Sequence, residues 1–174
     1  MILENDYIKL RPVEPEDASV MWLAEKDSTQ WIQNGMCAPL SRHNIEEYAL
    51  TYDADPFRAG QLRLIIEDKN NLSVVGIVDL FEISSIHRNA FVGIYIFPEK
   101  RESGYASLSL NLLEDYALRL LNLRHLGARI MADNVCSSAL FEKCGYILRG
   151  NIPEWFMIGN ASQSMLLYSK ILGA

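Results

Sequence analysis

The feature of this chain that most restricts its fold is a strand–helix–strand segment in its second half. Residues 89–97 (NAFVGIYIF) are typical of a strand, and Pro98 ends it. Apolar residues then recur at helical spacing through residues 107–121, and residues 125–132 (HLGARIMA) are typical of another strand. A helix that joins two strands of one sheet makes a right-handed crossover, so we expect these two strands to be parallel.

The other segments predict an α/β protein with a mixed sheet. We expect strands at residues 7–13, 61–68, 72–83, 146–150 and 163–171, and helices at residues 14–26, 41–54 and 136–144. The short connection at residues 69–71 (KNN) predicts a hairpin. Because hairpins pair strands in opposite directions, the expected sheet is twisted and mostly antiparallel, with one parallel pair and helices on both faces.

Length and composition indicate a single ordinary globular domain. The chain has 174 residues, of which 49% are hydrophobic and 22% charged. No apolar run approaches the roughly 20 residues that span a bilayer, and the first residues do not resemble a secretory signal, so we expect no membrane partner. The net charge of −6 disfavours nonspecific nucleic-acid binding and mildly favours a cationic small substrate.

The cysteines indicate where such a protein works. Cys37, Cys136 and Cys144 are odd in number, widely spaced and without the spacing of a metal site. A cytoplasmic protein with buried thiols and no metal is the simplest interpretation.

The long helix opens directly after residues 101–107 (RESGYAS). A helix N-terminus carries unpaired N–H groups and a partial positive charge, so it can bind a phosphate. Gly104 allows a backbone angle that a side chain would forbid, Ala106 keeps the approach open, and Arg101 can add positive charge. The alternative is that Gly104 serves only the geometry of the turn.

Two motifs resemble those of the GNAT N-acetyltransferases. Arg101, Gly104 and Ala106 fit the pattern Gln/Arg-x-x-Gly-x-Gly/Ala of that family's pyrophosphate loop. Residues 133–146 (DNVCSSALFEKCGY) are similar to its Asn-x-x-Ser…Glu-Lys-x-Gly-Phe/Tyr segment, and the order of strands and helices matches over essentially the whole chain. Residues 74–106 are most similar to the spermidine N-acetyltransferases, with the ribosomal-protein N-terminal acetyltransferases as close relatives.

The resemblance implies that acetyl-CoA, as cosubstrate, lies between the strands that end at residues 97 and 132. These strands would separate at their C-terminal ends, and the backbone of β-strand residues 96 and 97 would pair with the pantetheine arm. The amides of residues 102–107 would hold the pyrophosphate, Asn134 would contact the pantetheine arm, and Lys143 would approach the 3′-phosphate. The implied cofactor-binding set is Ile96, Phe97, Arg101, Glu102, Ser103, Gly104, Tyr105, Ala106, Ser107, Asn134 and Lys143.

One position departs from the pattern of the polyamine acetyltransferases. Where a tyrosine of that family protonates the departing thiolate, this chain has Phe141, which has no proton to give. Ser137 is the nearest hydroxyl that matches the family, and we expect it to act there or to cap the helix. A thiol has a pKa near 8.5, so the thiolate can also leave largely unaided.

The amine side of the reaction is less well defined by the sequence. An amine with a pKa near 10 must lose a proton before it attacks, and a carboxylate acting through water could remove it. Glu82 matches an acidic position of the spermidine enzymes and is the expected base; its alternative role is a solvated carboxylate. Asp79 and Glu82 are three residues apart, so in a regular strand their side chains would point to opposite faces. Asp79, His87 and Trp31 are the expected substrate contacts, although a loop histidine more often serves as a hydrogen-bonding residue.

The sequence therefore predicts an acetyltransferase that moves acetyl from acetyl-CoA to a primary amine by direct attack. A polyamine or similar small amine is the first acceptor, and a protein or peptide N-terminal amine is the alternative. A CoA-binding sensor without catalysis remains a third interpretation because of Phe141. A homodimer or larger homo-oligomer is also expected.

Overall fold

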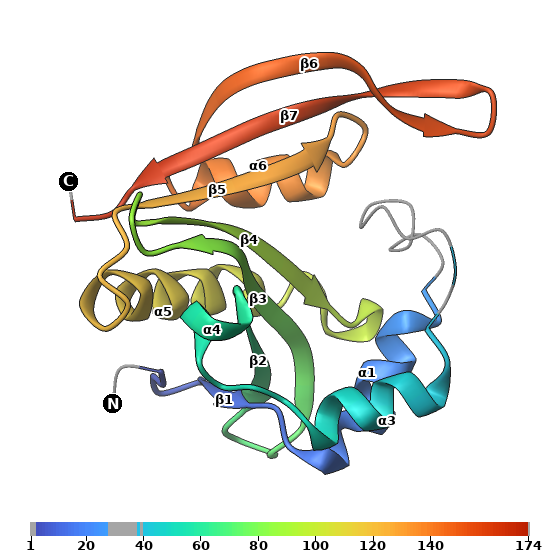
Figure 1. The fold of residues 1–174 in the computed structure, drawn as a ribbon, viewed down its shortest axis with the longest axis vertical. Helices are drawn as coiled ribbons and strands as arrows, with labels where there is room; N and C mark the ends of the chain where they lie inside the picture. Colours follow the sequence, from blue (N-terminus) through green and yellow to red (C-terminus); the bar gives the residue numbers. More distant parts are fainter. Residues whose placement is uncertain (1–2, 28–37, 39, 174) are drawn as a thin grey trace.

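The computed structural model describes residues 3–27, 38 and 40–173 of the chain. Within these residues a seven-stranded sheet has the order β1-β2-β3-β4-β5-β7-β6 (Figure 1). The strands are β1 (Ile8–Pro12), β2 (Gln61–Asp68), β3 (Val74–Ser84), β4 (Asn89–Ile96), β5 (His125–Met131), β6 (Ile147–Ile158) and β7 (Ala161–Ile171). The helices are α1 (Ala18–Glu25), α3 (Arg42–Leu50), α4 (Pro56–Ala59), α5 (Tyr105–Arg119) and α6 (Val135–Lys143), with 3-10 turns η1 (Pro15–Asp17) and η2 (Pro98–Lys100).

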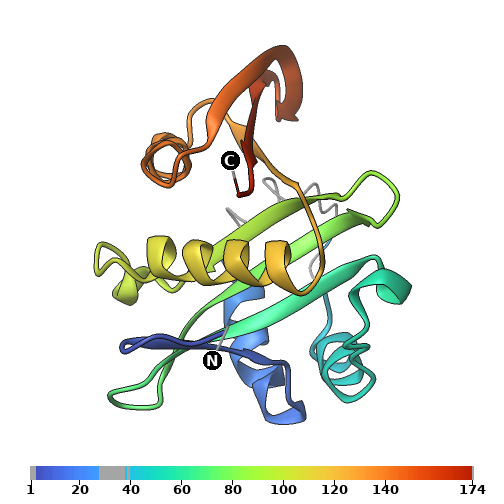
Figure 2. The same cartoon turned by 90° about the vertical axis from the view of Figure 1, so that its left-hand side faces the viewer.

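The strand directions confirm the predicted mixed sheet. Every neighbouring pair is antiparallel except β4 and β5, which are parallel. That pair is short, because it runs only from Asn89 opposite His125 to Phe91 opposite Gly127. Beyond this point β4 and β5 separate, and β5, β6 and β7 diverge from the rest of the sheet (Figure 2).

Helices cover both faces of the sheet because its strands are apolar on both sides. On one face, α5 buries Leu110, Leu113 and Ala117 against β1 to β5. On the other, α1 and α3 pack over Ile65 and Ile77, the alternate residues of β2 and β3. Within the described residues, no helix has both the length and the apolar character needed to cross a bilayer.

The main difference from the sequence expectation is β6, predicted over five residues and observed over twelve. Its residues are almost all exposed, and its pairing with β7 is interrupted at two places, after Leu148 and after Ile152. A strand exposed on both faces has no alternation of apolar and polar residues, so its sequence carries little strand signal. The helix expected over residues 41–54 ends at Leu50, and a separate short helix α4 begins at Pro56.

Candidate active site

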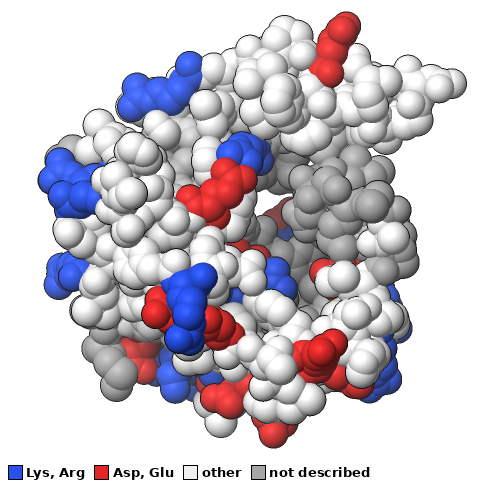
Figure 3. Space-filling model, viewed as in Figure 1, with Lys and Arg blue, Asp and Glu red and all other residues white. Residues whose placement is uncertain are grey.

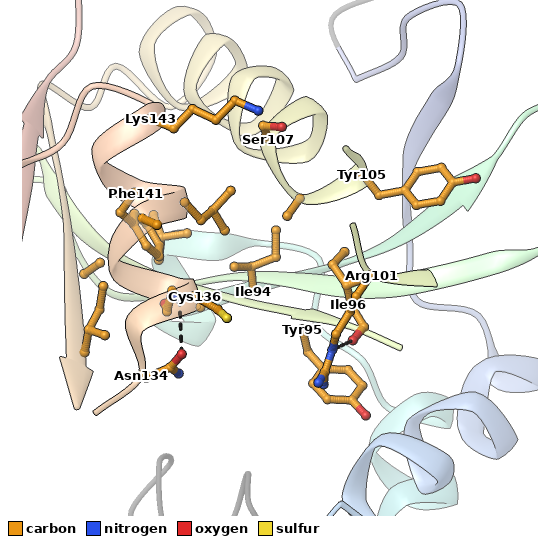
Figure 4. Close-up of a pocket in the computed structure, with 18 of the residues that line it drawn as sticks. Ile94, Tyr95, Ile96, Arg101, Tyr105, Ser107, Asn134, Cys136, Phe141 and Lys143 are labelled. Atoms are coloured by element: carbon orange, nitrogen blue, oxygen red, sulfur yellow. Dashed lines mark hydrogen bonds between the residues drawn. The ribbon is translucent and has the colours of Figure 1, made fainter. Parts of the chain in front are cut away.

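A cavity of about 670 Å³ lies where β4 and β5 separate (Figure 4). Its walls are the second half of β4, the connection from η2 into α5, the second half of β5, and α6. The two strands no longer bond to each other here, so their facing backbone groups are available to another partner, apart from the Ile96 carbonyl, which accepts from Arg101, and the Met131 carbonyl, which accepts from the Asn134 N–H. An extended group such as a pantetheine arm fits this need because it can pair as an added strand does.

The N-terminus of α5 opens into this cavity without a side-chain cap. Gly104, the residue before the helix, has φ +83°, and a Cβ placed on it would meet nothing within 4 Å. Glu102 also has a positive φ of 62°. The first helical hydrogen bond runs from the Leu108 N–H to the Gly104 carbonyl, 3.1 Å, so the N–H groups of residues 105–107 point out of the helix end. Left-handed residues next to a helix N-terminus form an anion-binding concavity, which suits a pyrophosphate.

Some side chains near the start of α5 face the cavity, and others contact the rest of the fold. Ser107 and Lys143 both line the cavity, on the same side of it in Figure 4. Tyr105 points away, and its hydroxyl donates to Asp68 of β2 at 2.8 Å, which anchors the first turn of α5. That hydrogen bond raises the pKa of Tyr105. The cavity lining therefore offers the ammonium groups of Lys100 and Lys143 besides the backbone amides, and the Ser107 hydroxyl, which donates to the Gly104 carbonyl at 3.1 Å.

Arg101 turns toward the face of β4 that lies opposite α5. Its Nε donates to the Ile96 carbonyl at 3.0 Å, its guanidinium lies 5.8 Å from the ring centre of Tyr95, and one terminal nitrogen is 3.8 Å from Asp27 at the end of α1. Figure 4 shows it beside Tyr95, away from Ser107. In this conformation Arg101 fixes the loop to β4 and contributes a charge near the loop backbone.

The end of β4 distributes its backbone groups between β3 and the cavity. The Phe97 N–H donates to the Val75 carbonyl of β3 at 3.0 Å. Successive strand residues direct their backbone groups to opposite sides, so those of Ile94 and Ile96 face the cavity. Phe97 thus lies at the end of the strand with its N–H already bonded.

Helix α6 closes the cavity opposite β4. Asn134 caps it by accepting from the Ser137 N–H at 3.1 Å. Phe141 is 3% exposed in the cavity wall, with its ring edge-on to Tyr146 at 4.8 Å between centroids. Cys136, expected as a buried thiol, is exposed and lines the cavity because it sits in the first turn of α6, which faces β4. This exposure could not be predicted, because the position of a single cysteine in a helix does not show which face of the helix it occupies.

We name the face of β3, β4 and β5 opposite α5 the acceptor side, because the sequence predicts the amine contacts Asp79 and Glu82 there. Phe81 and Phe91 stack on it at 5.9 Å between centroids, and Asp79 binds Arg63 through two hydrogen bonds of 2.8 Å. The strand β3 is bulged between Phe81 and Ser84, and Glu82 has φ +50°. The bulge turns the Glu82 side chain to the same face as Asp79, whereas a regular strand would place them on opposite faces.

Glu82 is paired with Arg129 of β5. The two guanidinium NH groups donate to the two carboxylate oxygens at 2.8 and 2.5 Å, and this hydrogen bonding lowers the pKa of Glu82. His87 lies in the turn before β4, at the far end of that strand from the cavity, and its N–H donates to Ser84 Oγ at 3.1 Å. Trp31 lies outside the described residues.

The sequence and structure comparisons agree with this geometry. The profile of the acetyltransferase (GNAT) domain matches residues 8–147, and the chain belongs to this family of acetyl-CoA-dependent acetyltransferases. The spermidine N(1)-acetyltransferase of Vibrio cholerae is 33% identical over 133 residues, which cover 74% of this chain and 76% of that protein.

Solved structures of a Vibrio cholerae spermidine N-acetyltransferase are also similar. One, in complex with CoA and spermine, superposes with a TM-score of 0.85 at 25% identity and covers 97% of both chains. Another, described as dodecameric, has a TM-score of 0.78 at 26% identity and covers 97% of this chain and 95% of that one. The predicted family, fold and cosubstrate are therefore confirmed.

Proposed function

We propose that this enzyme acetylates a primary amine and that a polyamine or similar small amine is its acceptor. The observation that carries the proposal is the cavity between β4 and β5, which has the uncapped end of α5 and, from β5, Arg129, the partner of Glu82 on β3, in its wall. A spermidine acetyltransferase shares a third of its residues over most of the chain, and a neighbouring structure holds CoA and spermine.

In this proposal the backbone supplies most of the binding of the cosubstrate. Amides of residues 104–107 and Lys143 neutralise the phosphates, and the backbone of Ile96 aligns the arm so that the thioester lies between β4 and β5. The amine approaches from the acceptor side, and its proton passes through a bound water to a carboxylate. Ser137 of α6 is the hydroxyl that the family pattern places nearest to the departing thiolate. A thiol with a pKa near 8.5 leaves as the thiolate with little help from a proton donor.

The assembly is also part of the proposal. A Vibrio cholerae relative is described as dodecameric, and its chain is covered almost end to end by this one. We infer that this protein forms a homo-oligomer, which sedimentation of the purified protein tests directly.

One observation favours a peptide N-terminal amine as a second candidate acceptor. Asp79 pairs with Arg63, Glu82 with Arg129, and Asp27 lies 3.8 Å from Arg101. Three carboxylates of the acceptor side are thus opposed by three arginines, which reduces the attraction for a polycation. An acceptor with a single amine is less affected by this compensation.

A panel of amines separates these functions. Purified protein is mixed with acetyl-CoA and spermidine, spermine, simple monoamines or short peptides, and free CoA and acetylated product are both quantified. The proposal expects the highest kcat/KM with polyamines. Faster acetylation of peptides would favour the second candidate. Tight binding of acetyl-CoA without CoA release from any amine would indicate a sensor instead.

A further inference from the structure

Arg129 occupies a defined position at the point where the sheet opens. It lies two residues beyond Gly127, the last residue of β5 that pairs with β4, and it lines the cavity. Its guanidinium carbon is 3.8 Å from the centre of the Phe91 ring, so the guanidinium lies over this side chain of β4. Gly127 makes room for this arrangement, because a Cβ there would come within 2.8 Å of the same ring.

Glu82 reaches this guanidinium only because of a local distortion of β3. The bulge and the left-handed backbone at Glu82 turn its carboxylate across β4 toward β5. A glutamate in this backbone conformation is strained, and the two hydrogen bonds to Arg129 help to hold it there. The ion pair therefore bridges β3 and β5 on the acceptor side, with Arg129 in the wall of the cavity.

Glu82 is the most accessible of the three carboxylates of the acceptor side that face an arginine. Its side chain is 54% exposed, compared with 27% for Asp79 and 22% for Asp27. Figure 3 shows a hollow in the face of the molecule drawn in Figure 1, with acidic and basic side chains at its edge. An acceptor that enters from this side meets the Glu82 carboxylate with its charge already compensated.

We propose that Arg129 is a specificity-determining residue that acts as an internal competitor for Glu82, the carboxylate that would otherwise bind the second ammonium group of a polyamine. The inference rests on the proposed function. An acceptor with one amine leaves the ion pair intact. An acceptor with a second ammonium group must displace Arg129 or approach its charge, so the pair weakens the binding of polyamines relative to monoamines.

The physical basis is the weakness of exposed ion pairs. Such pairs stabilise by only a small amount, so an ammonium group can compete with a guanidinium for one carboxylate. Removing Arg129 deletes the competitor and a repulsive charge at once. Removing the charge of Glu82 has the opposite effect, since it leaves an uncompensated guanidinium in the cavity wall.

The test measures equilibrium binding of spermidine and of hexylamine to the CoA-loaded protein by calorimetry. Arg129→Gln should bind spermidine about fivefold more tightly, the upper range for an exposed pair, with hexylamine changed by less than about twofold. Glu82→Gln should bind spermidine more weakly. Arg124→Gln, which removes an exposed positive charge just before β5 without touching the pair, should change neither ligand.

Each result decides the inference. Spermidine binding that is unchanged or weaker in Arg129→Gln, or an equal gain for both amines, overturns it. Should Arg129→Gln fail to fold, unchanged or tighter spermidine binding in Glu82→Gln overturns it equally. The amine panel is separate: a wild-type protein that acetylates no amine contradicts the proposed function, whereas the binding comparison still decides the role of Arg129.

Discussion

Replacing Gly104 by valine should separate the binding of CoA from the stability of the fold. Gly104 has φ +83°, and nothing lies within 4 Å of a Cβ built there. A Cβ at this position therefore meets no protein atom, and we expect the valine side chain to obstruct the approach of a phosphate to the loop. A side chain at this φ is strained by roughly 1–2 kcal/mol, which either destabilises the protein or pulls the amides of the loop out of position.

We expect the Kd for CoA, measured by calorimetry, to rise at least tenfold, which corresponds to about 1.4 kcal/mol. The matched control is Gly60→Val, because Gly60 has φ +69°, equally open surroundings and no place in the cavity wall. It should lose similar stability in urea unfolding and keep its CoA affinity. If Gly104→Val lost stability like the control yet bound CoA as tightly as wild type, the phosphate site at α5 would be refuted.

Three further changes test other parts of the structure. Phe141→Tyr places a hydroxyl in the cavity wall and should raise kcat at neutral pH, measured as CoA release; a flat or lower kcat in the folded variant would show that thiolate protonation is not limiting. Lys170 pairs with the buried carboxylate of Glu114 at 2.6 Å, so Lys170→Met leaves that carboxylate without this partner. The free energy of unfolding in urea should therefore fall by about 3 kcal/mol, and adding Glu114→Leu should recover most of the loss. Burial alone would raise the pKa of Asp17, but hydrogen bonds from Arg11 and from the backbone lower it overall. The Asp17 carboxylate therefore stabilises the protein above its ordinary pKa of 3.8, and this contribution is lost as the pH falls through the lower folded-state pKa. The difference in unfolding free energy between wild type and Asp17→Asn should be constant near neutral pH and should narrow below about pH 4. A difference that persisted in acid would contradict the assignment.

The sequence predicted the central part of the fold because that part is defined by local patterns. The apolar spacing of residues 107–121 and the alternation of the flanking strands indicate a crossover, and a crossover requires a parallel pair. Gly104 also carried a readable signal, since a glycine directly before a helix points to a positive φ. These features depend on residues close together in the chain.

The acceptor side could not be predicted in the same way. Glu82 and Arg129 are 47 residues apart, and they meet only because β3 is bulged and β4 and β5 part after three paired positions. Neither the bulge nor the length of the parallel pairing has a strong local signal. The sequence therefore located the carboxylate but missed its partner, and with it the compensation of the Glu82 charge by Arg129.

A crystal structure of the protein with CoA would test the proposed cosubstrate site. We predict that the pyrophosphate accepts hydrogen bonds from the N–H groups of residues 104–107, that the arm pairs with the backbone of Ile96, and that the thiol lies between β4 and β5, on the side of the cavity closed by Phe141. CoA bound at another place, or a thiol far from the opening between β4 and β5, would contradict it.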